Sequence, residues 1–388
     1  MNPLEQKIIS RIKKNGPMSF DAFMEMSLYD PEWGFYMSHE VRIGREGDFY
    51  TSSHLHPVFG AMVAKQIVEM WDILGRPENF TVLEMGAGEG YLCGDILDWL
   101  SRKNDLETAV HDELEESRRD CYGNLRYVIV ERNPLQVRRQ QQNIPGHQGK
   151  VSWLSDLGDA GEITGCVLSN ELIDAFPVHR VRKGDVLAEI LVDFDGSEFR
   201  EVLCPLSSGK LMRYFEDAGI TLEAGYTTEV NLRMRDWLSS VSSILKNGFV
   251  FTIDYGYPAE EYYSEERNRG TLMCYYRHQL NEDPFAHPGE QDITAHVDFS
   301  SLKRWGEEMG IRPVGYCSQG AFLLSIGIDA EIARLAETSS EYLFELARIK
   351  KLFMPQGLGE SHKVMIQFKG ADLPRLKGFS IRNQLRIL

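Results

Sequence analysis

The chain has 388 residues, of which 43% are hydrophobic, and a formal net charge of −16 at pH 7. This length and apolar content suit one large domain with added segments, or two domains. The excess of acidic side chains argues against nucleic-acid binding, which depends on Lys and Arg.

Six cysteines occur without the C-x-x-C spacing of metal or redox sites, so we interpret them as reduced thiols. The amphipathic start of the chain lacks the features of a secretion signal or a transit peptide. No stretch of sequence has the apolar length of a membrane span. We therefore expect a cytoplasmic bacterial protein with no membrane span, and the sequence leaves open whether it forms an oligomer.

Residues 1–75 are predicted to form an N-terminal helical and loop region. One helix is expected from Leu4 to Asn15, a second after Ser19 as its N-cap, and a third over Val58–Leu74. Between them, the segment Leu28–Met37 mixes aromatic and turn residues, which indicates weak strands and ordered loops.

A short apolar strand followed by a glycine-rich turn lies at Val82–Gly90, with the sequence V-L-E-M-G-A-G-E-G. The strand ends at the acid Glu84, and the turn runs through Gly86, Gly88 and Gly90 into a helix. Glycines let the backbone approach a ligand closely, and the N-terminus of the helix offers N–H groups to it. The turn is therefore a candidate ligand site.

The spacing of these glycines narrows the choice of ligand. In the dinucleotide pattern G-x-G-x-x-G, the third glycine would fall on Tyr91 or Cys93. No P-loop sequence follows either. An acid before G-x-G-x-G suits S-adenosylmethionine (SAM), whose ammonium group Glu84 would attract. A generic turn of an α/β domain remains the alternative interpretation.

From residue 81 the pattern alternates between strands and helices. Apolar runs of strand length are found at Thr81–Glu84, Tyr127–Glu131, Val151–Leu154, Cys166–Ser169 and Gly248–Asp254. Such runs predict an α/β fold, with a doubly wound, largely parallel sheet between two layers of helices. Pro313–Tyr316 and Lys363–Phe368 are expected to close the sheet, and Ser101–Gly123 is interpreted as an exposed insertion.

Three acidic side chains end the first three predicted strands. Glu84 ends the first, Glu131 ends the second and Asp156 follows the third. Ligands of open α/β sheets bind beyond the carboxyl ends of the strands, so Glu131 is a candidate for the ribose hydroxyls and Asp156 for an adenine amine. Each acid alone could instead be a helix cap.

The segment N-E-L-I-D-A-F-P, residues 170–177, follows the fourth predicted strand. Its polar residues Asn170, Glu171 and Asp174 are costly to bury without partners. Asp254 ends the fifth strand, and Glu229 is expected at the start of a helix over Glu229–Lys246. Together these side chains would form an acidic pocket that favours a cationic acceptor. Helix capping by Asn170 and Asp174 is the alternative.

Val178–Leu203 alternates between strand and turn residues and predicts an antiparallel β meander. We therefore divide the chain into four regions. They are the N-terminal region 1–75, the cofactor half of the core 76–177, the inserted antiparallel region 178–228, and the second half of the core 229–388 with an acceptor-binding loop at 258–300.

Several histidines could suggest a metal. His278, His287 and His296 fall in the acceptor-binding loop, and His54 and His56 are expected on one side of a strand. Because no Cys or paired acid stands at ligand spacing, we predict no metal site. The loop is instead interpreted as a lid, whose other wall would be lined by Tyr29, Tyr36, Phe49 and Tyr50.

Seven sequence motifs, taken in their order along the chain, indicate the family more specifically. They are Leu28–Met37, Gly47–Ser52, Pro57–Gly60, Glu84–Gly90, Asn170–Arg180, Ile253–Gly256 and Gly270–Phe299. Through them the chain resembles, over nearly its whole length, the SAM-dependent methyltransferase family of MidA and the mitochondrial complex I assembly factor, the protein arginine methyltransferase of that organelle. The resemblance implies a seven-stranded Rossmann-like methyltransferase core. It also implies an arginine acceptor on a protein, with a complex I subunit as a candidate.

If the acceptor is a guanidinium, carboxylates must hold it and polarise one nitrogen. We expect Glu171 and Asp174 to do so, with Asp254 and Glu229 as second choices; Glu84, Gly86, Gly88, Gly90, Glu131, Asp156 and Asn170 are the expected cofactor contacts. A methyltransferase of small molecules or bases, a SAM-binding assembly chaperone without transfer, and a dehydrogenase are the alternatives.

Overall fold

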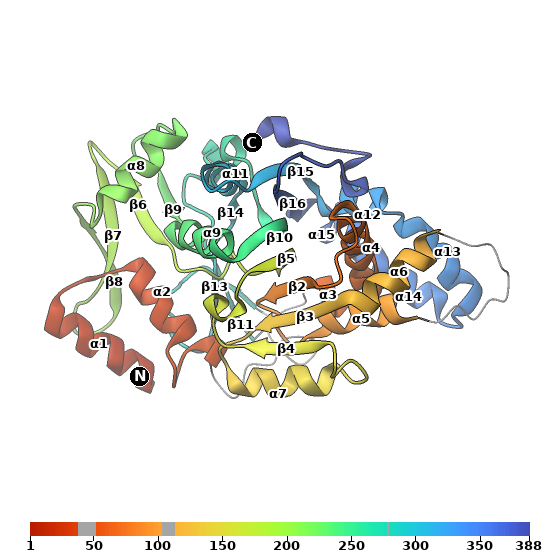
Figure 1. The fold of residues 1–388 in the computed structure, drawn as a ribbon. Coiled ribbons are helices and arrows are strands. Elements are labelled where there is room, and N and C mark those ends of the chain that lie inside the picture. Colours follow the sequence, from red (N-terminus) through yellow and green to blue (C-terminus); the bar gives the residue numbers. More distant parts are fainter. Residues whose placement is uncertain (38–51, 103–112, 278) are drawn as a thin grey trace. The chain divides into compact units, whose positions relative to one another are not determined.

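The structure is a computed structural model that describes residues 1–37, 52–102, 113–277 and 279–388 (Figure 1). The predictions for Phe49, Tyr50 and His278, and for residues 103–112 of the insertion at 101–123, lie outside these residues. The prediction that the insertion is exposed is wrong for its described part, because the helix Glu113–Asn124 buries Ser117, Arg118 and Cys121. The chain divides into two compact units. Unit 1 comprises Met1–Phe49, Ile173–Trp237 and Tyr257–Leu302; unit 2 comprises Tyr50–Leu172, Leu238–Gly256 and Lys303–Leu388.

Unit 2 contains a mixed sheet in which seven strands follow one another in the order β15-β16-β10-β5-β2-β3-β4. Strands β2, β3, β4, β5 and β10 are parallel, whereas β16 runs antiparallel to both β10 and β15. The strands are β2 (Phe80–Met85), β3 (Leu125–Val130), β4 (Val151–Leu154), β5 (Ile163–Asn170), β10 (Leu245–Tyr257), β15 (Arg312–Ser318) and β16 (His362–Lys369). The predicted α/β fold is therefore confirmed.

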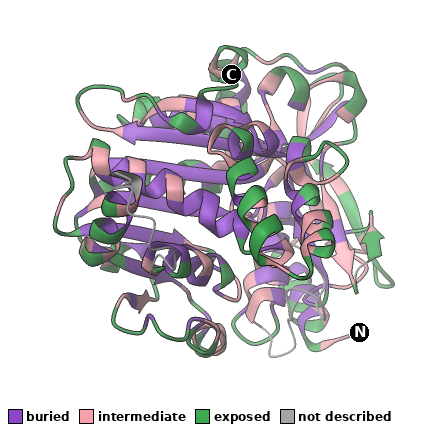
Figure 2. Ribbon diagram, turned by 90° about the vertical axis from the view of Figure 1, so that its right-hand side faces the viewer, coloured by how far each residue is buried: buried purple, intermediate pink, exposed green. Residues whose placement is uncertain are grey.

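Apolar residues on both faces explain why these strands are central. In β2, five of the six residues are buried, and Figure 2 shows the central strands as buried. One core joins Val82, Leu168 and Phe251 of the sheet to Phe59 of α4 and Ile96 of α5. Burying such side chains stabilises the fold by about 1.5–3 kcal/mol each.

Helices connect the strands of unit 2. They are α3 (Ser52–Leu55), α4 (Val58–Ile73), α5 (Tyr91–Ser101), α6 (Glu113–Asn124), α7 (Pro134–Asn143), α11 (Phe299–Glu308), α12 (Gln319–Ser325), α13 (Ile328–Thr338), α14 (Tyr342–Phe353) and α15 (Leu358–Ser361), of which α11 begins in unit 1. The predicted helix at 58–74 is confirmed as α4. The strand expected for His54 and His56 is wrong, because His54 lies in α3 and His56 follows it.

Unit 1 is built on a five-stranded antiparallel sheet of order β1-β7-β6-β9, with β8 paired to β7. Its strands are β1 (Met18–Ser19), β6 (His179–Lys183), β7 (Leu187–Phe194), β8 (Phe199–Cys204) and β9 (Thr227–Val230). A smaller sheet has the order β12-β11-β13, formed by β11 (Met273–Tyr276), β12 (Gln279–Asn281) and β13 (Asp292–Thr294), and β14 (Val297–Asp298) follows.

The helices of unit 1 are α1 (Pro3–Asn15), α2 (Phe20–Tyr29), α8 (Gly209–Ala218), α9 (Leu232–Ile244, which continues into unit 2) and α10 (Ala259–Tyr262). The predicted N-cap is confirmed, since the Ser19 side chain accepts a hydrogen bond from the N–H of Ala22. The helix predicted over Glu229–Lys246 begins three residues later than expected. Glu229 lies in β9, because the backbone there pairs with β6, and Asn231 bonds to the N–H of Met234 in the first turn of α9.

Among the described residues, no helix is long and apolar enough to cross a membrane.

Candidate active site

The glycine turn joins β2 to α5, so the predicted strand, turn and helix are confirmed. Gly86, Gly88 and Gly90 have φ angles of 76°, 53° and 84°, a region that favours glycine. A Cβ atom on Gly86 would lie 2.9 Å from Cδ1 of Leu172. Gly90 caps α5 without a side-chain hydrogen bond, so the first turn of the helix offers its N–H groups to a ligand.

Glu84 lies two residues before this turn and is only 2% exposed. One carboxylate oxygen, Oε2, accepts a hydrogen bond of 2.8 Å from the Tyr127 hydroxyl. Burial raises the pKa of Glu84 to about 7, although this hydrogen bond acts in the opposite direction. Since no cation neutralises Glu84 among the described residues, a ligand ammonium could supply the missing charge.

Glu131 follows β3 and is connected to the glycine turn through one amide side chain. Its Oε2 accepts a hydrogen bond of 3.1 Å from Nε2 of Gln140, and the same Nε2 donates to the carbonyl of Gly88 at 2.8 Å. The N–H of Asn133 donates to Oε1 at 2.8 Å. Burial raises the pKa of Glu131. The structure therefore brings Glu131 and the turn together, as expected for two parts of one site.

Sequence reasoning missed Gln140. Its Oε1 also accepts a hydrogen bond of 2.9 Å from Nε1 of Trp153, which fixes the orientation of the amide. A buried glutamine on a polar helix such as α7 was the available signal, but the sequence alone does not show which of the neighbouring glutamines is buried.

Asp156 differs from Glu84 and Glu131, because its hydrogen bond is made to a residue only two positions further along the chain. It follows β4, caps the short 3₁₀ helix Leu157–Ala160, and accepts a hydrogen bond of 2.8 Å from the N–H of Gly158. Its exposed carboxylate lies 4.0 Å from Arg132. Helix capping accounts for these contacts, and a role with adenine stays a prediction.

The segment after β5 holds one of the two non-glycine residues of unit 2 that have a positive φ among the described residues, the other being Arg76. Strand β5 lies between β2 and β10, where the order of the parallel strands reverses, and ligands bind at such points. Glu171 immediately follows β5 and has a φ of +52°. This strained conformation is held by hydrogen bonds from the Glu171 N–H to the Ile253 carbonyl (2.9 Å) and from the Leu172 N–H to Oδ2 of Asp254 (3.2 Å).

Strain in a non-glycine residue persists only where the surroundings enforce it, and it concentrates at functional sites. The side chains of Asn170 and Glu171 are mostly buried. Oδ1 of Asn170 is buried and has no hydrogen-bond partner within the part of the chain that the structure describes. A buried acceptor of this kind is costly unless a ligand donates to it.

The four expected acceptor residues divide between the units. Glu171 and Asp254 belong to unit 2, where the fully buried Asp254 supports the loop through the N–H groups of Leu172 and Tyr255. Asp174 and Glu229 belong to unit 1 and are also buried. The backbone carbonyl of Asp174 accepts a hydrogen bond of 2.9 Å from the N–H of Ala295.

Glu229 is already held by other side chains of unit 1. Its Oε2 accepts hydrogen bonds from the N–H (2.7 Å) and hydroxyl (3.1 Å) of Thr271, and its Oε1 lies 3.8 Å from Nε of Arg180. Burial raises the pKa of Glu229, whereas Arg180 and Thr271 act to lower it. These contacts give Glu229 a structural role, and binding of the acceptor by it stays a prediction.

The aromatic residues expected along the lid pack within unit 1. Tyr29 and Tyr36 stack with ring centroids 5.5 Å apart, the Tyr36 hydroxyl donates to Oδ1 of Asp292 at 2.8 Å, and Tyr29 donates to the Ala175 carbonyl at 2.9 Å. His287 stacks on Tyr276 at 4.0 Å. In the residues that the structure describes, no group of three or more His, Cys, Asp or Glu is arranged to hold a metal ion.

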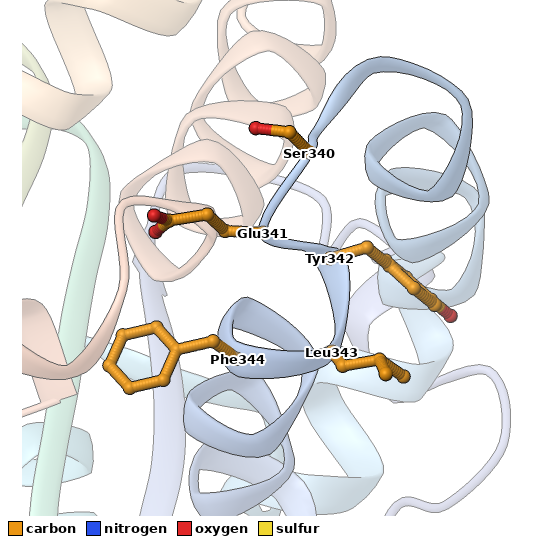
Figure 3. A pocket seen from close by; sticks show the side chains of 5 residues that line it. All are labelled: Ser340, Glu341, Tyr342, Leu343 and Phe344. Carbon is orange, nitrogen blue, oxygen red and sulfur yellow. The ribbon is translucent and has the colours of Figure 1, made fainter.

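A shallow pocket of about 540 Å³ occurs elsewhere in unit 2, where α14 begins (Figure 3). Its lining runs from Ser340 to Phe344, and in Figure 3 the side chains of Tyr342 and Leu343 point away from those of Glu341 and Phe344. None of the predicted site residues lines it.

A sheet with five parallel strands, a glycine turn after the first of them, an acid before that turn and an acid after the next strand is typical of α/β proteins that bind nucleotides. Residues 62–317 match the family described as "Putative S-adenosyl-L-methionine-dependent methyltransferase". The chain belongs to this family.

Two kinds of relative support this membership. A crystal structure of a COG1565 superfamily member from Burkholderia thailandensis, bound to S-adenosyl-homocysteine, is 32% identical with a TM-score of 0.87 and covers 99% of this chain and 96% of that one. "Protein arginine methyltransferase NDUFAF7 homolog, mitochondrial" of Drosophila melanogaster is 28% identical over 97% of this chain and 87% of its own. The mouse protein arginine methyltransferase NDUFAF7 is 27% identical over 93% and 83%.

The protein is thus a SAM-dependent methyltransferase, and the predicted cofactor is confirmed. The residues of unit 2 fit this cofactor in three respects. The glycine backbone at 86–90 lets a ligand approach closely, and Glu84 has no cation beside it among the described residues. Oδ1 of Asn170 is buried and has no hydrogen-bond donor among the described residues. When bound, SAM supplies a methyl group on a positively charged sulfur, which is already electrophilic.

Proposed function

We propose that this methyltransferase modifies an arginine side chain of a protein substrate. The observation that carries the proposal is Glu171, a carboxylate held in a strained conformation where the strand order reverses, in the same unit as the glycine turn. The curated relatives named as protein arginine methyltransferases support the choice of acceptor.

Methyl transfer to a guanidinium depends more on how the protein positions the acceptor nitrogen than on the acid strength of the protein's side chains. A guanidinium is planar, stays protonated at neutral pH and pairs with carboxylates through two parallel hydrogen bonds. Glu171 would hold the acceptor in this way and concentrate negative charge beside the attacking nitrogen. Alignment of nitrogen, methyl carbon and sulfur lowers the barrier by several kcal/mol, since the entropy of orientation has already been lost on binding.

The other site residues receive roles on the same basis. We assign Glu84, the turn glycines, Glu131, Asp156 and Asn170 to the cofactor, and Asp174, Asp254 and Glu229 to acceptor binding with Glu171. The seven consecutive strands of unit 2 are proposed as the methyltransferase core. The meander within 178–228 and the loop at 258–300 are proposed as insertions that recognise the acceptor.

Mass spectrometry of arginine peptides tests this function. Cells with and without the gene are compared, and the proposal expects at least one protein whose arginine methylation disappears with the gene and returns with the wild-type copy. A complex I subunit is the substrate that we expect. An unchanged set of methylarginines, with transfer of methyl groups to small molecules, would show that the acceptor is of another class.

We further propose that the protein acts in the bacterial cytoplasm, for which the unpaired cysteines and the bacterial relative are the support. Fractionation of cells followed by immunodetection tests this location.

A further inference from the structure

The carboxylate of Glu171 is contacted unevenly within unit 2. Its Oε1 accepts hydrogen bonds from the N–H of Ser52 (3.3 Å) and from Nδ2 of Asn170 (3.5 Å), and Nε2 of His362 lies 3.5 Å from it without forming a hydrogen bond. Among the described residues, no hydrogen bond or ion pair engages Oε2. One oxygen is therefore held by the protein, and the other is left for a ligand.

His362 is itself firmly placed. It is the first residue of β16, its backbone pairs in register with Tyr255 of β10, and the side chain is about 7% exposed. The Tyr255 ring packs against the imidazole at 5.4 Å, and Nδ1 lies 3.1 Å from the Ser361 hydroxyl. These contacts fix the ring so that Nε2 is the nitrogen near Glu171.

We propose that His362 is a positioning residue for the methyl-transfer reaction. By contacting Oε1, it restricts the rotation of a carboxylate whose backbone is already strained, so that Oε2 is held ready for an N–H group of the acceptor guanidinium. This role rests on the proposed function, because it assigns His362 to the binding of the same acceptor.

The alternative is a purely structural role, in which His362 only fills space at the start of β16. The two roles differ in what a substitution changes. A positioning role affects the turnover of the acceptor and depends on a polar nitrogen beside Oε1 of Glu171. A structural role depends on volume and affects folding.

The experiment compares the full-length wild type with His362→Leu and His362→Gln. Initial rates of tritium transfer from methyl-labelled SAM to a protein extract of cells lacking the gene are measured, together with calorimetric affinity for S-adenosyl-homocysteine and the melting temperature. Leucine removes the polar nitrogen near Oε1 of Glu171, and the glutamine amide can supply another.

We expect His362→Leu to lower kcat/KM for the acceptor roughly tenfold, the effect of losing one orienting contact. The affinity for S-adenosyl-homocysteine should change less than about twofold, and His362→Gln should recover most of the rate. His147→Leu is the matched control, because His147 is also buried and contacts a carboxylate, Asp98, in unit 2. It should lower the melting temperature without lowering the rate.

A His362→Leu rate equal to that of the wild type would overturn the positioning role while leaving the proposed function intact. The same holds if both variants lose rate equally and in proportion to their loss of melting temperature. Absence of protein methylation by the wild type would instead overturn the proposed function and, with it, this role.

Discussion

Glu84 of unit 2 and Glu229 of unit 1 are both buried carboxylates, but they are stabilised in different ways. Glu229 has a guanidinium and two donors from Thr271 near it. Glu84 receives one hydrogen bond from a neutral tyrosine, and burial raises its pKa to about 7. Arg180 compensates the charge of Glu229 within the protein, although Oε1 of Glu229 accepts no hydrogen bond. Glu84 has no cation beside it among the described residues, which leaves room for a cationic ligand.

Glu171 extends this comparison to the acceptor. Like Glu84, it keeps an oxygen that no described residue engages, but its backbone is strained as well. Glu84 and Glu171 therefore differ from Glu229 in having no Arg or Lys side chain beside them among the described residues, and the predictions below test whether this difference marks a binding residue.

The largest effect is expected for Glu171→Gln. Loss of the negative charge beside the attacking nitrogen should lower the rate of methyl transfer by 10² to 10³, up to about 4 kcal/mol. Affinity for S-adenosyl-homocysteine should stay unchanged. Transfer rates and calorimetry check this, with Glu331→Gln, a substitution in an ion-pair cluster of unit 2, as the control. Undiminished turnover in Glu171→Gln would remove it from the acceptor site.

Glu229→Gln should lower the stability of the fold in addition to weakening acceptor binding. Arg180 would keep its ion pair with Glu201, but the buried donors of Thr271 would face a weaker acceptor, so we expect a loss of about 1–3 kcal/mol. Chemical denaturation at pH 7 measures the change in the free energy of unfolding. A stable variant that has lost only its activity would show that Glu229 serves the acceptor directly.

Gly86→Ala should weaken cofactor binding roughly thirtyfold, or about 2 kcal/mol, because a Cβ atom strains the backbone and displaces Leu172. Gly146→Ala is the matched control, since Gly146 has a similar φ of 88° but no atom within 4 Å of the added Cβ. Calorimetry with S-adenosyl-homocysteine should separate the two variants. Equal affinities in them would mean that the ligand does not depend on this turn.

The smallest effect concerns pH. With its pKa near 7, Glu84 is protonated in most molecules at pH 6 and ionised in most at pH 8, and only the ionised form attracts the ligand ammonium. Affinity for S-adenosyl-homocysteine should therefore rise about tenfold from pH 6 to pH 8. Glu84→Gln should abolish this rise.

The same raised pKa affects folding with a definite sign. A carboxyl group whose pKa is higher in the folded than in the unfolded state destabilises the protein increasingly as the pH rises from about 4.5 to about 7. Glu84→Gln should therefore stabilise the empty protein more at pH 8 than at pH 5. Denaturation curves showing the opposite trend would contradict the assigned pKa shift.

The sequence was most informative where the pattern was local. The apolar runs predicted β2, β4 and the closing strands, and the glycines predicted the turn at 86–90 that leads into a helix, because both depend on neighbouring residues. Glu229 was assigned to a helix because its membership of β9 depends on pairing with β6, some fifty residues away.

Long-range contacts also account for what the sequence did not reveal at the site. The positive φ of Glu171 is enforced by Ile253 and Asp254, and the contact with His362 joins residues far apart in the chain. The segments of the two units alternate along the sequence, so position alone could not show that Glu171 and Asp174 belong to different units.

The identity of the labelled amino acid tests the central claim most directly. Wild-type protein is incubated with methyl-tritiated SAM and an extract of cells lacking the gene, and the proteins are then hydrolysed and their amino acids separated. The account predicts tritium in methylarginine. Label confined to another amino acid, or no label in protein despite bound cofactor, would contradict it.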